Sequence, residues 1–114
     1  MKADREYGDF VNDMLSSIKD TYEFTKSMNY EDFFRDRKTT HATVRSLEIF
    51  GEAAKHIPQN IRDRHTDIPW KKIIGLRNRI AHDYFGIDLK LVWKIVKEEL
   101  PELKPAIQRL SKKI

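Results

Sequence analysis

The sequence contains no cysteine, and this absence excludes disulfide bonds, thiolate catalysis and cysteine-ligated zinc. Glycine and proline are scarce, with 4 of each among 114 residues, which favours helices over a β-sandwich. No apolar run approaches the length needed to cross a bilayer, and the charged first residues have no apolar core for a signal peptide. These absences predict a soluble, cytoplasmic protein that makes no use of a membrane.

An excess of charge of either sign is also nearly absent. The 22 Lys and Arg residues exceed the 18 Asp and Glu residues only slightly and leave a formal net charge of +4. This mild excess is compatible with an RNA substrate, but it does not by itself establish nucleic-acid binding. The length is that of one ordinary domain with a single core, so we expect one domain over residues 1–114.

Apolar residues recur at helical spacing through most of the chain. The pattern predicts helical segments at residues 9–28, 30–35, 38–57 and 60–64, then from 67 into the 76–85 run, and from 88 into the tail. Asp9, Asn29 and Asp88 are the expected N-caps, and Pro101 is expected to break or kink the last segment. These segments predict an all-α fold, an antiparallel bundle of about four or five helices.

Several residues within these helices carry further expectations. The apolar stripe of the helix at residues 9–28 is expected to include Tyr22. The buried side of the helix that leads into the 76–85 run is expected to include Ala81. Gly51 costs about 1 kcal/mol of helix propensity against alanine, and we interpret it as the close approach of a neighbouring helix. Glu48 and Glu52 lie one turn apart; such a pair can bind metal or transfer protons, but on a charged helix it is usually solvated or paired with basic residues.

The stretch richest in chemical groups is Leu76-Arg77-Asn78-Arg79-Ile80-Ala81-His82-Asp83-Tyr84-Phe85. Asn78 and His82 are four residues apart and share a helix face, as do Arg77 and Tyr84, seven apart. Arg77 and His82 are five apart, roughly 140° around an ideal helix. To meet one phosphate, either the helix must loosen near His82 or a second copy must face the first. Gly86 suits a helix C-terminus, so the spacing indicates a site at a helix end, which two chains could share.

The motif in this stretch is similar to that of a known family. Arg77 to His82 match the R-x4-6-H motif of the HEPN superfamily, and Tyr84 extends the match to R-x4-H-x-Y, which resembles the HepT-like toxins of bacterial and archaeal toxin–antitoxin pairs. Blocks at residues 47–54, 68–70, 75–77 and 92–93 also resemble that family in the expected order. The resemblance therefore covers nearly the whole chain.

The resemblance implies a helical bundle that forms a homodimer, with the two R-x4-H motifs facing one cleft. It implies a metal-independent endoribonuclease toxin that needs no cofactor, in a type VII-like HEPN/MNT toxin–antitoxin pair. The implied partner is a minimal nucleotidyltransferase antitoxin, which neutralises the toxin by transferring AMP to the motif tyrosine, Tyr84 in this chain.

The residues themselves fit that chemistry. His82 can accept or donate a proton near neutral pH, and Arg77 can fork onto two phosphate oxygens. Asn78 can orient the histidine or the phosphate, and Arg79 can add positive charge at the phosphate. We therefore expect Arg77, Asn78 and His82 to be catalytic and Arg79 to bind substrate phosphate.

Three other readings stay open from the sequence. In a purely structural reading, the two motif arginines pair with Glu48 or Glu52, His82 caps a helix and Tyr84 packs in the core. In a second, the chain is a non-catalytic helical module that binds a nucleotidyltransferase. In a third, it is a general RNA-binding bundle whose binding weakens with salt and survives the loss of His82.

Overall fold

The computed structural model describes residues 2–81 and 86–113, with side chains described from Tyr7 onward within these ranges. The elements are α1 (Lys2–Thr25), α2 (Tyr30–Arg35), α3 (Arg37–Lys55), α4 (Gln59–Arg64), α5 (Trp70–Ile74), α6 (Leu76–Ile80), α7 (Leu89–Lys94), the π-helical segment η1 (Ile95–Glu99) and α8 (Leu100–Ser111). Across these two ranges the only β-type pairing is one isolated bridge. The predicted all-α class is confirmed.

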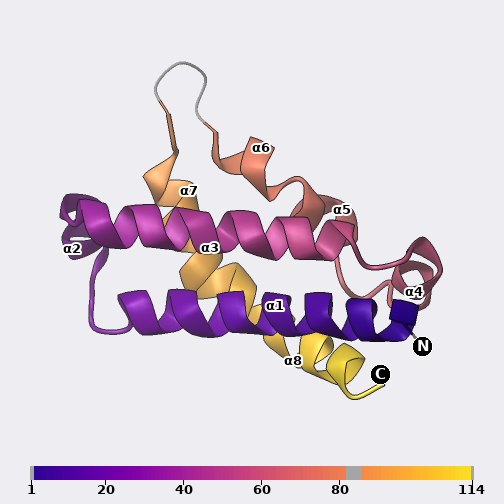
Figure 1. Ribbon diagram of the computed structural model, residues 1–114. Helices are drawn as coiled ribbons and strands as arrows, with labels where there is room; N and C mark the ends of the chain where they lie inside the picture. Colours follow the sequence, from indigo (N-terminus) through magenta and orange to yellow (C-terminus); the bar gives the residue numbers. More distant parts are fainter. Residues whose placement is uncertain (1, 82–85, 114) are drawn as a thin grey trace.

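The long helices α1 and α3 lie side by side and run antiparallel (Figure 1). The run α7–η1–α8 packs against both of them, with α7 on α3 and with η1 and α8 on α1. Helices α5 and α6 pack on the side of α3 that faces away from α1. None of the helices described is both long and apolar enough to span a membrane.

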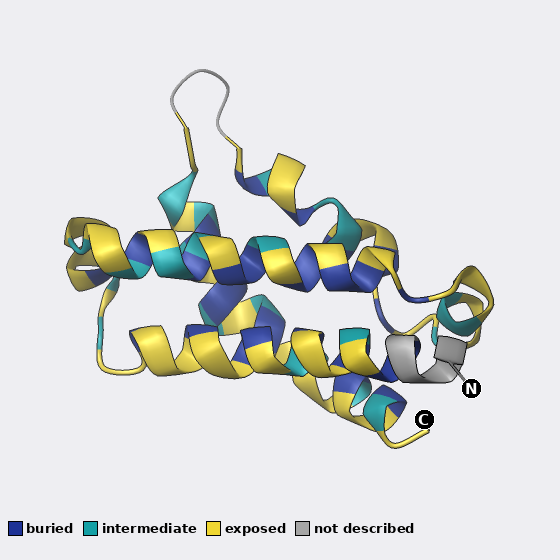
Figure 2. Cartoon of the chain, viewed as in Figure 1, coloured by how far each residue is buried: buried dark blue, intermediate teal, exposed yellow. Residues whose placement is uncertain are grey.

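The core lies between these helices, and the buried positions of α1 and α3 face inward (Figure 2). Its fully buried side chains include Met14, Phe33, Leu47, Phe50, Leu76, Ile80, Ile95, Leu100, Ile107 and Leu110. Tyr22 is not among them, because its side chain is 59% exposed. The inward face of this part of α1 carries Thr21 and Thr25 instead, whose hydroxyls donate to carbonyls of their own helix. The prediction that the apolar stripe includes Tyr22 is wrong.

Asn29 and Asp88 are helix N-caps as predicted, whereas Asp9 is not. Asn29 accepts from the Asp32 N–H at 2.8 Å and Asp32 accepts from the Asn29 N–H at 3.2 Å, which is the capping box of α2. Asp88 accepts from the Leu91 N–H and caps α7 as predicted. Asp9, in contrast, lies inside α1, because that helix already begins at Lys2. The predicted N-cap at Asp9 is wrong.

Gly51 on α3 marks the closest approach of the α5 backbone. A Cβ placed on Gly51 would lie 2.8 Å from the Ile73 carbonyl oxygen, closer than such atoms pack in proteins. The predicted close approach of a neighbouring helix is confirmed. It places the C-terminal end of α5, and the α6 helix that follows, directly against α3.

The predicted disturbance at Pro101 takes the form of the π-helical segment that precedes it. Proline has no N–H, and in a regular α-helix its ring would collide with the carbonyl four residues earlier, at Lys97. The wider π turn of Ile95–Glu99 relieves this collision, so the helical run continues from Leu89 to Ser111.

Candidate functional site

The predicted single helix leading into the motif is divided at Gly75 into α5 and α6. The Gly75 N–H donates to the Lys71 carbonyl, and the Gly75 carbonyl accepts from Arg79, so one helix ends where the next begins. Leu76 and Ile80 of α6 are buried, with exposures of 2% and 1%. These two anchors hold a five-residue helix whose polar residues lie between them.

Arg77 and Asn78 are exposed and line one pocket of about 430 Å³ between α3 and α6. The pocket is also lined by Arg45, Glu48, Gly51, Glu52, Lys55 and Ile74. The structure therefore brings two predicted site residues together with a mixed set of charged groups on α3. An exposed arginine beside an amide can hold a phosphate through several directional hydrogen bonds.

The carboxylates that face this pocket have partners on their own helix. Glu48 lies 3.5 Å from Arg45, and Glu52 lies 3.7 Å from the His56 ring nitrogen. Within residues 7–81 and 86–113, Arg77 forms no ion pair, and no three potential ligand side chains gather in a metal-binding group. The expectation that Glu48 pairs with a basic residue is confirmed, and the structural alternative of an Arg77 pair with Glu48 or Glu52 is not what the described residues show.

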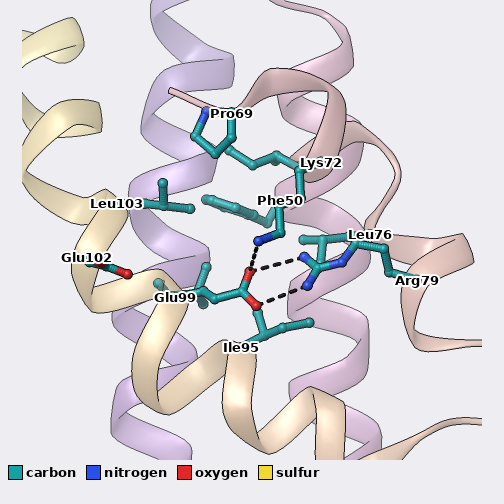
Figure 3. Close-up of a pocket in the computed structure, with 11 residues that line it drawn as sticks. Phe50, Pro69, Lys72, Leu76, Arg79, Ile95, Glu99, Glu102 and Leu103 are labelled. Carbon is teal, nitrogen blue, oxygen red and sulfur yellow. Dashed lines mark hydrogen bonds and ion pairs between the residues drawn. The ribbon is translucent and has the colours of Figure 1, made fainter. Parts of the chain in front are cut away.

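Arg79 has a partner that the sequence did not indicate. Its two terminal nitrogens donate to the two oxygens of Glu99 at 3.1 and 3.0 Å, and Lys72 Nζ lies 3.6 Å from the same carboxylate (Figure 3). The Arg79 guanidinium holds the pKa of Glu99 below its usual value. The two residues are twenty apart on different helices, so no local periodicity points to the pair. The role of Arg79 at a phosphate stays a prediction.

The helix ends before His82, which is one of the two arrangements that the spacing of the motif allows. α6 ends at Ile80, and Ala81 is extended, with φ −70° and ψ 138°. Ala81 is therefore exposed, and its predicted burial on the helix is wrong. Gly86, expected to end this helix, lies six residues beyond its last residue and has φ +93°, a conformation that favours glycine.

His82 and Tyr84 lie outside the described residues, so their roles stay predictions. The two ends of their segment are held together, because Ala81 bridges Ile87 and the Asp88 N–H donates to the Ile80 carbonyl at 2.8 Å. A second pocket, of about 460 Å³, lies beside the returning end and is lined by Thr40, His41, Val44, Arg45, Glu48, Gly86, Ile87 and Leu89. Arg45 and Glu48 line both pockets, so the two pockets lie next to each other on α3.

Comparison with known proteins places these residues in a family context. The model of the ribonuclease HepT-like family matches residues 14–110. A relative from Thermococcus cleftensis, named as a probable ribonuclease HepT, is 41% identical over 108 residues, covering 95% of this chain and 98% of the relative. A relative from Methanocaldococcus jannaschii, named as a candidate RNase, is 42% identical over 104 residues, covering 91% and 95% of the two chains. A third, from Caldanaerobacter subterraneus subsp. tengcongensis and also named as a candidate RNase, is 37% identical over 113 residues, covering 99% and 98%. No solved structure matches the chain.

Proposed function

The chain belongs to the HepT-like ribonuclease family, and from this premise we propose that it is the toxin of a type VII-like HEPN/MNT toxin–antitoxin pair. In this proposal two copies form a homodimer and cut RNA in the cleft where their motifs meet. The reaction uses no metal and no cofactor. A minimal nucleotidyltransferase partner neutralises the toxin by transferring AMP to Tyr84.

The observation that carries the proposal is the pocket shared by Arg77 and Asn78. Both side chains are exposed at its edge, and Arg77 has no ion-pair partner among the described residues. The segment that holds His82 starts one residue after α6 ends and returns beside the adjoining pocket. A cation and an amide thus line a pocket close to the point where the chain enters the segment that carries His82.

The proposed chemistry is an internal transesterification of RNA. The 2′-oxygen attacks the adjacent phosphorus, a new P–O2′ bond forms, and the P–O5′ bond breaks to leave a 2′,3′-cyclic phosphate and a 5′-hydroxyl. One His82 accepts the 2′-hydroxyl proton, and the His82 of the facing copy supplies a proton to the leaving 5′-oxygen. Arg77 stabilises the negative charge that builds on the non-bridging oxygens, and Asn78 orients the phosphate or the ring.

AMP on Tyr84 would inhibit the same site by two physical effects. The Tyr84 oxygen attacks the α-phosphorus of a nucleoside triphosphate bound by the partner, pyrophosphate leaves, and the tyrosine proton passes to solvent. The product adds bulk and one negative charge two residues from His82. That charge competes with RNA phosphates for Arg77 and repels the incoming strand.

The test is RNA cleavage by protein produced without its partner, in the presence of EDTA. We expect cleavage by the wild type and its loss in His82→Ala and Arg77→Ala, while His65→Ala, which removes a histidine on α4's C-terminal side, retains full activity. Intact mass on the same samples identifies any protein already blocked by AMP. Full activity of folded His82→Ala would refute the catalytic assignment. Absence of cleavage by unmodified, dimeric wild type would instead favour the binding module for a nucleotidyltransferase.

A further inference from the structure

We propose that Glu99 is a positioning residue for RNA cleavage. Through its two hydrogen bonds to Arg79, its carboxylate fixes the rotation of α6 and so directs Arg77 and Asn78 toward the pocket. This inference rests on the proposed function, because it assigns Glu99 a part in the same reaction without contact to the substrate.

The need for such a residue follows from the shortness of α6. Five residues form little more than one turn, and a helix this short has no stability of its own. No side chain caps its N-terminus at Gly75. Leu76 and Ile80 determine which face of α6 is buried, but apolar contacts are not directional and do not orient its polar side chains.

The ion pair between Arg79 and Glu99 supplies a directional contact that orients α6. A guanidinium joined to a carboxylate by two parallel bonds has one preferred plane and approach. Arg77 and Arg79 are two residues apart, about 200° around the helix, and so point to opposite sides. Holding Arg79 against η1 therefore keeps Arg77 on the opposite side, at the pocket beside α3.

The Glu99 carboxylate extends from a part of the bundle whose neighbouring side chains are buried. Glu99 is the last residue of η1, and its neighbours Ile95 and Leu100 are each only 1% exposed. Its own side chain is 20% exposed, and that of Arg79 is 26% exposed. Apolar residues, among them Phe50, Leu76 and Leu103, line the pocket around the pair and limit its contact with water (Figure 3). Arg79 first, and Lys72 to a smaller extent, hold the pKa of Glu99 below its usual value.

The proposal separates the roles of the two motif arginines and replaces the phosphate-binding role predicted for Arg79. Arg77 contacts the RNA phosphate, whereas Arg79 acts through Glu99 and keeps its partner in the complex. A side chain that binds phosphate contributes to the salt dependence of RNA binding, and one that is already paired with a carboxylate does not. The two roles can therefore be told apart by a measurement other than activity.

The first experiment measures steady-state cleavage of one RNA by the full-length dimer. For Glu99→Gln we expect kcat to fall roughly tenfold or more with KM changed less than about threefold, since misplaced groups slow the chemical step. Glu99→Asp keeps the negative charge beside Arg79 and Lys72, so we expect it to retain more of kcat than Glu99→Gln does. The control Asp67→Asn removes the charge from an arginine–carboxylate pair on the exposed surface, in which Arg109 donates one bond to Asp67 at 3.1 Å, and leaves kcat unchanged.

The second experiment measures RNA binding at several salt concentrations. Arg79→Gln should leave the slope of log Kd against log salt unchanged, whereas Arg77→Gln should reduce it by roughly one contact, a change of about 0.7 for a single strand. A reduced slope in Arg79→Gln would overturn the proposal, as would wild-type kcat in Glu99→Gln. If Glu99→Gln does not fold, Arg79→Lys, which keeps the charge but loses the fork, takes its place in the kinetic test. A wild type that cleaves no RNA would refute the proposed function and the positioning role with it, whereas an active wild type with an unaffected Glu99→Gln refutes the positioning role alone.

Discussion

Replacement of Gly51 by alanine tests the packing that places α5 and α6 on α3. Alanine is the better helix former, so at an open position on α3 this change would stabilise the protein by about 1 kcal/mol. At Gly51 the added Cβ would lie 2.8 Å from the Ile73 carbonyl oxygen. This oxygen belongs to the backbone, so it cannot move aside by a change of rotamer.

The magnitude follows from these two opposing effects. Inserting a methyl group into a well-packed contact costs about 1–3 kcal/mol, because the neighbouring backbone must shift. Subtracting the gain in helix propensity of about 1 kcal/mol leaves a net destabilisation of about 1 kcal/mol for Gly51→Ala. For a domain of this size, that change lowers Tm by roughly 4 °C. The sign of the effect thus separates a close contact from an open position.

The assay is urea unfolding of Gly51→Ala at one fixed protein concentration, since the proposed dimerisation would make stability depend on concentration. Asn12→Ala is the control, because Asn12 is exposed on α1 and the smaller gain in helix propensity there should stabilise the protein by about 0.5 kcal/mol. If Gly51→Ala stabilised the protein as Asn12→Ala is expected to, the close approach of α5 to α3 would be refuted.

Three further predictions concern stability. Pairing with Arg79 lowers the pKa of Glu99 in the folded state below 4.5, so the wild type should be more stable than Glu99→Gln above about pH 4.5. This difference in stability should disappear as the pH falls through the lowered pKa. Urea unfolding of both proteins from pH 7 to pH 3 checks this. Thr43→Val should raise stability by about 1 kcal/mol in the same assay, because the buried Thr43 hydroxyl has no hydrogen-bond partner among the described atoms; a loss of stability would mean that the hydroxyl is bonded. Asn29→Ala should lower stability by about 1 kcal/mol by removing the capping box of α2, and thermal unfolding that matches the wild type would contradict that role.

Local rules explain why much of the fold could be predicted from the sequence. Asn29 and Asp88 cap helices by bonds to residues three positions ahead, so their signal lies within one turn. Gly51 could be interpreted because its cost in helix propensity is local even though its cause, the Ile73 carbonyl, is distant. Asp36 was missed because it ends α2 and caps α3 at once, with no loop between them to mark the boundary.

The sequence predicted the part of the site whose residues are close together in the chain. Arg77 and Asn78 are adjacent in sequence and line the same pocket, whereas the partner of Arg79 lies twenty residues away on another helix. The division at Gly75 also escaped prediction, because an internal glycine costs only about 1 kcal/mol and many helices tolerate it. Contacts between distant segments depend on how the helices pack, and a single sequence carries no periodic signal for them.

The π-helical segment Ile95–Glu99 has a consequence for insertions and deletions. A π turn closes its hydrogen bonds over one more residue than an α turn does, so deleting one residue here would convert the run into regular α-helix. Each residue in an α-helix turns the chain by about 100°, so the deletion would rotate the helix on one side of the gap relative to the other. Either Glu99 would turn away from Arg79, or Ile107 and Leu110 would leave the core. A relative shorter by one residue in this segment would therefore need either another carboxylate for the second arginine of its motif or other apolar residues to complete its core.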